Sequence, residues 1–508
     1  MMFVIVILST LCCVLYTSSR PIYVLFALNM QAYANNQHKI ADEMLTNPFL
    51  KAMSICKGTI SILDAGCVVY SRIWCIFELF KSVMGGNNSK YEFDVYTDRG
   101  GDNRAVGITH GYIPSDNGES DYKKHREYEF PLDRILQATN VDVKHAQASV
   151  ESDRRFILNT ITGLPEDDEV VDDHANYDEL NNILRGIFVT PALQRIIKEK
   201  DFDTITRCLD IVRASNTSII DLDLQYYPRF DDDILMKLAD SLPPTLTEFT
   251  LISKGSAVTV NGINASVGQI TGCPQLKKLI LRWNNIGDDG AKMIADALNG
   301  HHSLKTLVLR CNNIGDDGAK HIADALKDNH SLTILDLKEN NICADGAKMI
   351  ADVLKYNHSL KELSLSDNNI GANGAKMIAD ALKINQNLTL LDLHENNIGD
   401  DGIKQIADAL KDNHILETLN IGSNKIGDDG AKAIADTLKI NHSLKILSLN
   451  GNNIGADGAK MIADALKDNH SLEELDLGSN KIGVDGKGYL SKIKQELKAV
   501  KRYIYIHC

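Results

Sequence analysis

The amino-acid sequence predicts an α/β protein: a right-handed β/α solenoid in the C-terminal part, preceded by a parallel α/β domain. Two observations predict the solenoid. A 28-residue phrase repeats from residue 276 onward without insertion or deletion, and each copy joins a strand pattern to an amphipathic helix pattern. A third observation predicts the N-terminal domain, because apolar strand-like runs alternate with helical segments between residues 20 and 115.

The first half of the phrase predicts a strand. Its eight copies begin at Leu276, Leu304, Leu332, Leu360, Leu388, Leu416, Leu444 and Leu472. In the second copy Leu307 and Leu309 alternate as in a half-buried strand, and Asn312 follows them. The same slot holds Asn284, Asn340, Asn368, Asn396, Asn424, Asn452 and Asn480. Stacked copies therefore predict an asparagine ladder.

The second half of the phrase predicts a turn and a helix. Gly315 allows the chain to turn, and Asp316 or Asp317 is expected to cap the helix that follows. The helix carries one apolar stripe, made of Ala319, Ile322, Ala323 and Leu326. Asn329 is expected to end it in the left-handed conformation. One unit cannot bury its leucines alone, so neighbouring units must stack.

These patterns resemble the ribonuclease-inhibitor type of leucine-rich repeat over residues 276–486, about two fifths of the chain. The resemblance implies a horseshoe with a parallel sheet inside and helices outside. Residues 216–275 are interpreted as two degenerate capping repeats. Residues 487–508 are interpreted as a polar C-terminal cap in which the helix stripe is lost, because Lys487 and Lys494 replace apolar residues.

Length, charge and cysteine usage limit the possible functions. A chain of 508 residues is long enough for two or three domains. The formal net charge is −14 and no basic run occurs, so nucleic acid is not expected as a partner. The ten cysteines form no CxxC pair and no metal-ligand spacing, which favours a reducing compartment and a cytoplasmic protein without a metal.

The apolar N-terminal segment, residues 1–19, has two interpretations. Residues 3–16 are too few for a spanning helix and no Lys or Arg precedes them, which favours a buried parallel strand, a short crossover and a second strand. The alternative is a signal, which would place the protein in the secretory pathway; otherwise a membrane role is not expected. The Asn-x-Ser sequons at Asn329, Asn357, Asn441 and Asn469 arise from the repeat itself and do not indicate secretion.

Residues 20–165 carry the strand-like runs IYVLFAL, TISILDA and YEFDVYT between helical segments. The segment SRIWCIFEL, from Ser71 to Leu79, resembles a helix start of Toll/interleukin-1 receptor (TIR) domains. The resemblance implies a flavodoxin-like parallel sheet and an assembly or signalling role. Residues 97–125 are expected to form loops, residues 133–163 a helical region, and residues 166–215 an acidic linker followed by helices.

In some TIR domains the glutamate of this segment cleaves NAD, and the matching residue here is Glu78. A carboxylate there could stabilise a developing oxocarbenium ion. The simpler interpretation is a surface glutamate above core residues. Enzymatic activity is therefore the alternative and not the favoured prediction. No cofactor is expected, and NAD would be one only if this alternative holds.

The repeats contain no nucleophile–base pair, but the residues that follow each strand vary between copies. Along the array these two slots are basic and aromatic at first, then acidic, and finally small and polar. The candidate partner-binding residues are Arg282, Trp283, Arg310, Lys338, Glu339, Asp367, His394 and Glu395. An exposed Trp beside Arg is typical of a protein-binding hot spot.

These patterns predict a protein-binding scaffold or sensor that engages a protein on its concave repeat face, with self-association through the TIR-like module. Two alternatives stay open. One is the NAD-cleaving enzyme that uses Glu78. The other is a GTPase-activating protein, because the repeats resemble the array of the Ran GTPase activator, with Arg282 or Arg310 as the arginine that would reach the nucleotide.

Overall fold

The computed structural model describes residues 4–8, 11–17, 20–25, 58–63, 92–98, 105–110, 130–147, 151–165, 168–171, 173–499 and 503–508. The contacts within the chain divide it into two units, Met1–Thr217 and Ser218–Cys508. The boundary lies two residues beyond residue 216, where the sequence predicts the first capping repeat.

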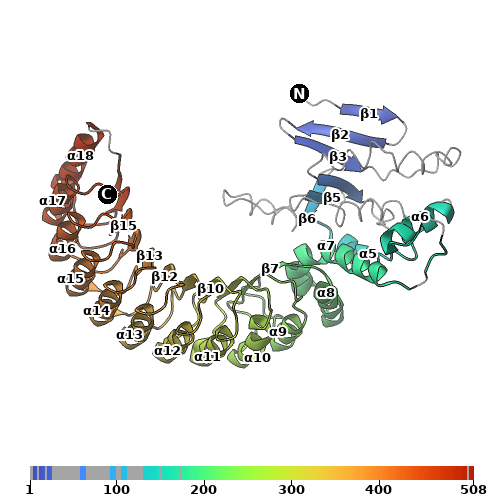
Figure 1. Cartoon of the computed structure of the whole chain (residues 1–508), viewed down its shortest axis with the longest axis horizontal. Coiled ribbons are helices and arrows are strands. Elements are labelled where there is room, and N and C mark those ends of the chain that lie inside the picture. Colours follow the sequence, from blue (N-terminus) through green and yellow to red (C-terminus); the bar gives the residue numbers. More distant parts are fainter. Residues whose placement is uncertain are drawn as a thin grey trace. The chain divides into compact units, whose positions relative to one another are not determined.

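The described strands of the first unit form one mixed sheet whose order follows the chain (Figure 1). The strands are β1 (Val4–Leu8), β2 (Leu11–Thr17), β3 (Arg20–Leu25), β4 (Gly58–Leu63), β5 (Glu92–Asp98) and β6 (Ala105–His110). Pairing is parallel between β3, β4 and β5. It is antiparallel between β1 and β2, β2 and β3, and β5 and β6.

This sheet corrects two predictions. The crossover expected after the first strand is the strand β2, because only two residues separate it from β1 and a parallel connection needs about a dozen or more. The loop expected at residues 97–125 contains the strand β6, whose segment AVGITH is rich in strand-forming residues. The sheet is therefore mixed where the sequence predicts a parallel one. The TIR-like resemblance and the signal interpretation of residues 3–16 stay predictions.

Four described helices complete the first unit: α5 (Leu132–Ala138), α6 (Glu151–Thr162), α7 (Ala175–Glu199) and α8 (Phe202–Ala214). The predicted helical regions thus contain helices. Asp201 caps α8, since its side chain accepts a hydrogen bond from the Thr204 N–H at 2.9 Å. The chain comes close to α7 just after α8, where a Cβ on Gly186 would stand 2.5 Å from the Ser215 Cβ.

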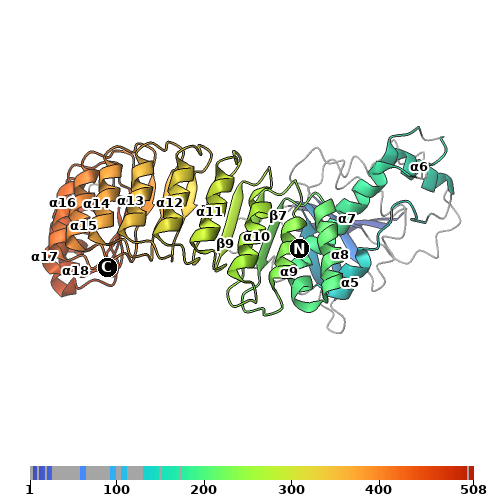
Figure 2. The same cartoon turned by 90° about the horizontal axis from the view of Figure 1, so that it is seen from below.

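The second unit is an array of strand–helix repeats whose described strands form one eleven-stranded parallel sheet in sequence order. Its strands are β7 (Ile219–Asp223), β8 (Glu248–Ile252), β9 (Lys278–Arg282), β10 (Thr306–Val308), β11 (Ile334–Asp336), β12 (Glu362–Ser364), β13 (Leu390–Asp392), β14 (Thr418–Asn420), β15 (Ile446–Ser448), β16 (Glu474–Asp476) and β17 (Tyr505–His507). Its helices are α9 (Asp232–Asp240), α10 (Val260–Thr271), α11 (Gly287–Leu298), α12 (Asp316–Leu326), α13 (Ala344–Leu354), α14 (Gly371–Leu382), α15 (Gly399–Leu410), α16 (Asp428–Leu438), α17 (Ala456–Ala465) and α18 (Gly483–Ala499). The strands line the inner side of a curved array and the helices its outer side (Figures 1 and 2).

The core of each repeat lies between its strand and its helix, as predicted. Leu307, Leu309, Ile314, Ile322 and Leu326 are all fully buried. The same register joins every pair of neighbouring strands, for example Leu307 with Leu279 on one side and Leu335 on the other. Apolar side chains at equal positions therefore stack along the whole array, which is how short repeats obtain a continuous core.

The predicted asparagine ladder is confirmed. The Asn312 amide nitrogen donates to the Leu281 carbonyl at 2.6 Å, and its oxygen accepts from the Asn284 N–H at 2.9 Å. Asn340 repeats this arrangement one step along, donating to the Leu309 carbonyl at 2.9 Å. Each side chain thus satisfies buried backbone groups of the preceding repeat, and the ladder joins the repeats to one another.

A second ladder corrects the prediction for Asn329. This residue is not left-handed; it is 2% exposed, and its amide donates to the carbonyl oxygens of Leu298 and His301. Its oxygen accepts from the Leu332 N–H at 2.9 Å. The same role falls to Asn357, Asn385, Asn413, Asn441 and Asn469. The asparagines of the four sequons are therefore buried in the folded repeats.

The expected helix caps also differ from the prediction. Asp316 does not cap its own helix α12; its Oδ1 accepts from backbone N–H groups at the start of α13, in the next repeat. Asp288, Asp400 and Asp428 do the same for the helix after their own. The cap crosses between repeats because adjacent helices pack closely enough for a short carboxylate to reach its neighbour.

The C-terminal end corrects one further expectation and adds a strand that the sequence does not predict. The helix stripe is not lost in α18, because Leu490, Ile493 and Leu497 are buried while Lys487 and Lys494 are exposed. The strand β17 then pairs parallel with β16, with Ile506 opposite Leu475. The last repeat thus needs charged residues only on the side of its helix that no further repeat covers.

Candidate functional site

The candidate site is the concave strand face of the array. Two slots follow each second strand leucine. The first slot, row A, contains Arg282, Arg310, Lys338, Ser366, His394, Gly422, Asn450 and Gly478. The second slot, row B, contains Trp283, Cys311, Glu339, Asp367, Glu395, Ser423, Gly451 and Ser479. The eight residues predicted to bind a partner lie in these two rows.

Every residue of row B has a left-handed backbone, with φ between 53° for Asp367 and 65° for Gly451. The reason is a backbone hydrogen bond to the next repeat, such as that from the Cys311 N–H to the Lys338 carbonyl at 3.1 Å. For residues other than glycine this conformation costs roughly 1–2 kcal/mol. The strand ladder on one side and the asparagine ladder on the other hold the row in place.

The basic row A residues Arg310 and Lys338 form ion pairs with carboxylates of the next repeat. The Arg310 guanidinium forms an ion pair with Asp336 on β11. Lys338 pairs with Asp367 at 3.1 Å and lies 3.8 Å from Glu339. The sequence predicts a basic end and an acidic middle as separate regions, whereas the structure joins them through ion pairs between neighbouring repeats.

Asp336 is a site residue that sequence reasoning missed. It is 5% exposed and its Oδ1 also accepts from the Lys338 N–H at 3.0 Å. The sequence pattern that could have identified Asp336 lies in the strand and not in the variable rows. Asp392 and Asp476 occupy the same strand slot and accept equivalent backbone hydrogen bonds. Such an aspartate accepts a hydrogen bond from the backbone N–H two residues after it, and it places its carboxylate beside row A of the preceding repeat.

These pairs change the protonation properties of the site. Burial lowers the pKa of Lys338, but the hydrogen bond and charge of Asp367, with the charge of Glu339, outweigh it, so the pKa is raised. Burial, followed by the hydrogen bond to Glu339 and the charge of that residue, raises the pKa of the Cys311 thiol to about 12. Cys311 is therefore a neutral thiol at pH 7 that donates to Glu339 at 3.0 Å.

Further along the face, His394 Nε2 lies 3.9 Å from Glu395, so this pair carries an attractive charge only when the histidine is protonated. The N-terminal end differs from the middle. Lys254 Nζ stands 3.6 Å from the centroid of the Trp283 ring, a cation–π contact, and Trp283 is 37% exposed. Lys254 lies in the second capping repeat, to which the sequence assigns only a structural role. We call Lys254, Arg282 and Trp283 the Arg282 cluster.

Comparison with known proteins identifies the repeats. The family described as Leucine Rich repeat matches residues 272–295, 300–323, 328–351, 356–379, 385–407, 412–435, 441–463 and 468–487. These eight segments are leucine-rich repeats. Among solved structures, the chain is similar to one described as leiomodin-1 actin-binding site 2, with 26% identity, coverage of 31% of this chain and 94% of that chain, and a TM-score of 0.26. No curated protein matches this chain.

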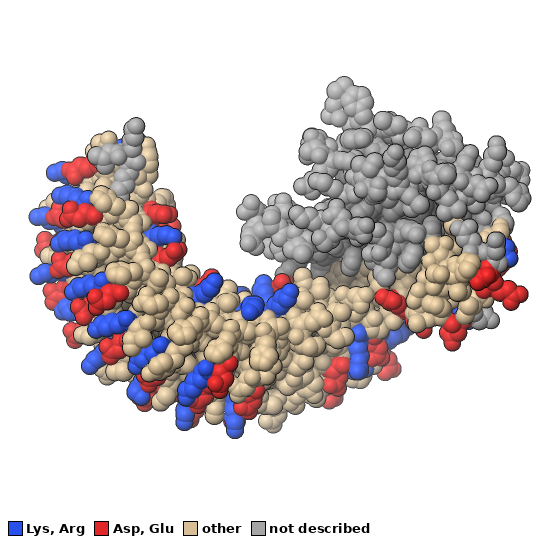
Figure 3. All heavy atoms as spheres, in the orientation of Figure 1, with Lys and Arg blue, Asp and Glu red and all other residues tan. Residues whose placement is uncertain are grey.

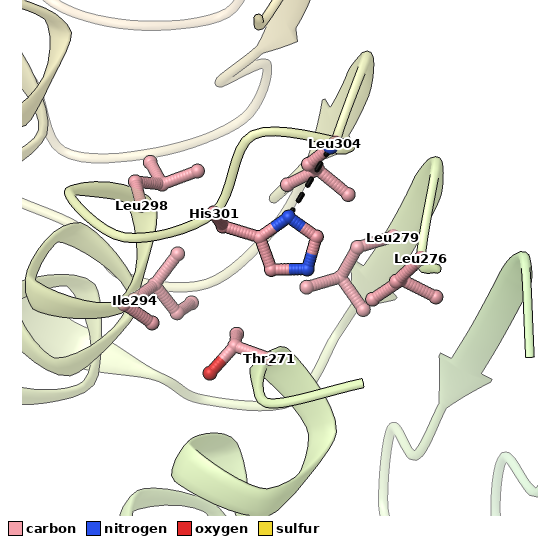
Figure 4. Close-up of a pocket in the computed structure, with 8 residues that line it drawn as sticks. Thr271, Leu276, Leu279, Ile294, Leu298, His301 and Leu304 are labelled. Carbon is pink, nitrogen blue, oxygen red and sulfur yellow. Dashed lines mark hydrogen bonds between the residues drawn. The ribbon is translucent and has the colours of Figure 1, made fainter. Parts of the chain in front are cut away.

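One small cavity lies inside the leucine-rich repeats, beneath His301 (Figure 4). His301 occupies the slot of the second asparagine ladder, where its Nε2 lies 3.0 Å from the Cys273 carbonyl and its Nδ1 accepts from the Leu304 N–H at 3.2 Å. The cavity measures about 10 Å³ and is lined mainly by leucines, Ile294 and Ala297. The cavity is large enough for one water molecule and too small for a substrate.

The remaining predictions concern chemistry. Glu78, the residue expected to act on NAD, lies outside the described residues. In the described part of the chain, no group of three or more His, Cys, Asp or Glu side chains could hold a metal ion. Nor is any helix in that part both long and apolar enough to span a membrane.

Proposed function

We propose that the chain is a protein-binding scaffold whose leucine-rich repeats engage a protein partner through the concave strand face. The observation that carries this proposal is an exposed tryptophan, Trp283, with a left-handed backbone. A bulky residue is unfavourable in the left-handed conformation, and more than a third of this side chain is exposed. Ser423, Gly451 and Ser479 fill the same slot elsewhere, so the fold does not need tryptophan there. Exposed Trp beside Arg is typical of binding hot spots.

The proposal is tested by partner capture with the full chain and the variant Trp283→Ser, which places at this slot the residue found at Ser423. Tyr356→Ser is the matched control, because Tyr356 is 76% exposed and lies outside rows A and B. We expect the wild type and the control to retain the same partner, and Trp283→Ser to lose it at unchanged thermal stability. Equal capture by Trp283→Ser would contradict the proposal.

The proposal also includes the first unit. Residues 20–165 are expected to act as a TIR-like assembly module, supported by the segment SRIWCIFEL and by the parallel pairing of β3, β4 and β5. Consumption of NAD by the full chain, compared with Glu78→Ala, separates this role from the enzymatic alternative. Turnover that disappears in the variant would assign the module a catalytic function instead.

A cytoplasmic location forms part of the same proposal. Support comes from free thiols: the cysteines Cys208, Cys273, Cys311, Cys343 and Cys508 form no disulfide. We likewise propose the ribonuclease-inhibitor subtype for the repeats, because the 28-residue period is constant and each copy contains a helix.

A further inference from the structure

Row A carries a cation in three consecutive repeats, but only two of these cations are neutralised within the repeats. Arg310 pairs with the strand residue Asp336 of the next repeat, and Lys338 pairs with the row B residue Asp367 of the next repeat. The repeat register shows which residues stand in these two places beside Arg282. They are Val308, in the slot of Asp336, and Cys311, in the slot of Asp367. Neither carries a charge at pH 7.

Arg282 and Lys254 are therefore left with positive charge that nothing in the described part of the chain balances. No carboxylate of the described residues pairs with either side chain, and the Arg282 Nε is buried without an acceptor there. A buried N–H without an acceptor is unfavourable. The buried Nε is closed to a ligand, but a carboxylate could neutralise this charge and form a charge-assisted hydrogen bond with the part of the half-buried Arg282 side chain that solvent reaches.

Two apolar side chains lie beside the Arg282 cluster on strands β8 and β9. Ile252 pairs in register with Arg282, and Ile280 lies two residues before it on β9; both are half-buried. Towards the C-terminal end the concave face carries the carboxylates of Glu339, Asp367 and Glu395. Figure 3 shows Lys and Arg side chains on part of the inner face and both signs of charge over the helices. A ligand with carboxylates is thus attracted at the cluster.

We infer that the Arg282 cluster binds an acidic peptide segment of the protein partner, with its carboxylates on Arg282 and Lys254 and its apolar side chains against Trp283 and Ile280. The inference rests on the proposed function and adds the chemistry of the partner. Charge complementarity selects this occupant, because the only unbalanced charges in rows A and B of the first repeats are positive.

The repeat register supplies a test that leaves the cluster itself intact. Val308→Asp places a carboxylate beside Arg282, in the slot where Asp336 neutralises Arg310, and that slot tolerates a buried aspartate. Ser448→Asp is the matched control: it introduces the same aspartate in the same strand slot, but Gly422 takes the place of the arginine. The probe is fluorescein-labelled decaglutamate, titrated into the full chain at low salt and followed by anisotropy. We expect about tenfold weaker binding for Val308→Asp and less than twofold change for Ser448→Asp.

A second variant keeps the test decisive if Val308→Asp fails to fold. Asp336→Val should release Arg310 and strengthen decaglutamate binding severalfold, a gain that a misfolded protein cannot show. Equal effects of Val308→Asp and Ser448→Asp, unchanged binding in Asp336→Val, or tighter binding of an oligothymidylate of equal charge would each overturn the inference. A partner still captured through Trp283 in any of these cases would leave the proposed function standing and remove only the acidic peptide.

Discussion

The Asp316 carboxylate holds the backbone of Cys343, 27 residues away in the next repeat, through a hydrogen bond of 2.7 Å from the Cys343 N–H. The same Oδ1 accepts from the Gly346 N–H at 2.9 Å. Where this slot holds Ala344, Ala372 or Ala456 instead, the residue 27 positions later is a glycine with positive φ: Gly371, Gly399 and Gly483. The aspartate thus decides how the next helix begins.

Removing this cap should destabilise the array. Asp316→Ala leaves two backbone N–H groups of the next repeat without their acceptor, and we expect a loss of about 1 kcal/mol in the free energy of unfolding. Denaturant unfolding followed by far-UV circular dichroism measures it. Asp317→Ala is the control, because Asp317 is exposed. Adding Cys343→Gly to Asp316→Ala should recover part of the loss, and equal stabilities of the two single variants would refute this account.

The two kinds of helix start should respond differently to a Cβ. Gly371 has a φ of 63°, so Gly371→Ala forces a left-handed alanine and should lower stability by about 1 kcal/mol, although space is available. Gly315 has a φ of −97°, and its added Cβ would lie 3.3 Å from the Asp288 carboxylate. Gly315→Ala should therefore change stability by about 0.5 kcal/mol or less. Similar losses in both variants would show that backbone conformation is not what distinguishes them.

The 28-residue period predicts correctly what a repeat contains: its strand, its helix stripe and the ladder of Asn312. It does not show which repeat a polar side chain serves. The sequence predicts that Asp316 or Asp317 caps its own helix and that Asn329 ends one. Asp316 and Asn329 instead bond to neighbouring repeats, and Arg310 also pairs with a residue of the next repeat. A pattern within one copy records residue types, whereas these contacts depend on the spacing between stacked copies.

The ladder asparagines should contribute more than their exposed neighbours. Asn368 donates to the carbonyl oxygens of Leu337, Leu365 and Ser366 and accepts from the Ile342 N–H at 2.9 Å. Asn368→Ala leaves these buried groups unpaired, so we expect a loss of about 2 kcal/mol or more. Asn369→Ala, at the exposed adjacent position, should cost less than about 0.5 kcal/mol. Denaturant unfolding of both variants decides the comparison, and a small effect at Asn368 would contradict the ladder's role.

The Cys311 thiol should react slowly at neutral pH. Its pKa is raised from 9.0 to about 12 by burial and then by Glu339, so the reactive thiolate is scarce at pH 7. Because the folded pKa lies above the ordinary value, the thiol contributes to stability below about pH 9, and this contribution is lost as the pH rises towards 12. Glu339→Gln removes the negative charge, so the pKa should fall and alkylation by iodoacetamide, resolved by peptide mass spectrometry, should accelerate. Glu395→Gln makes the same change two repeats away and should leave the rate unaltered. A rate in Glu339→Gln equal to that of the wild type would show that burial alone suppresses the thiolate.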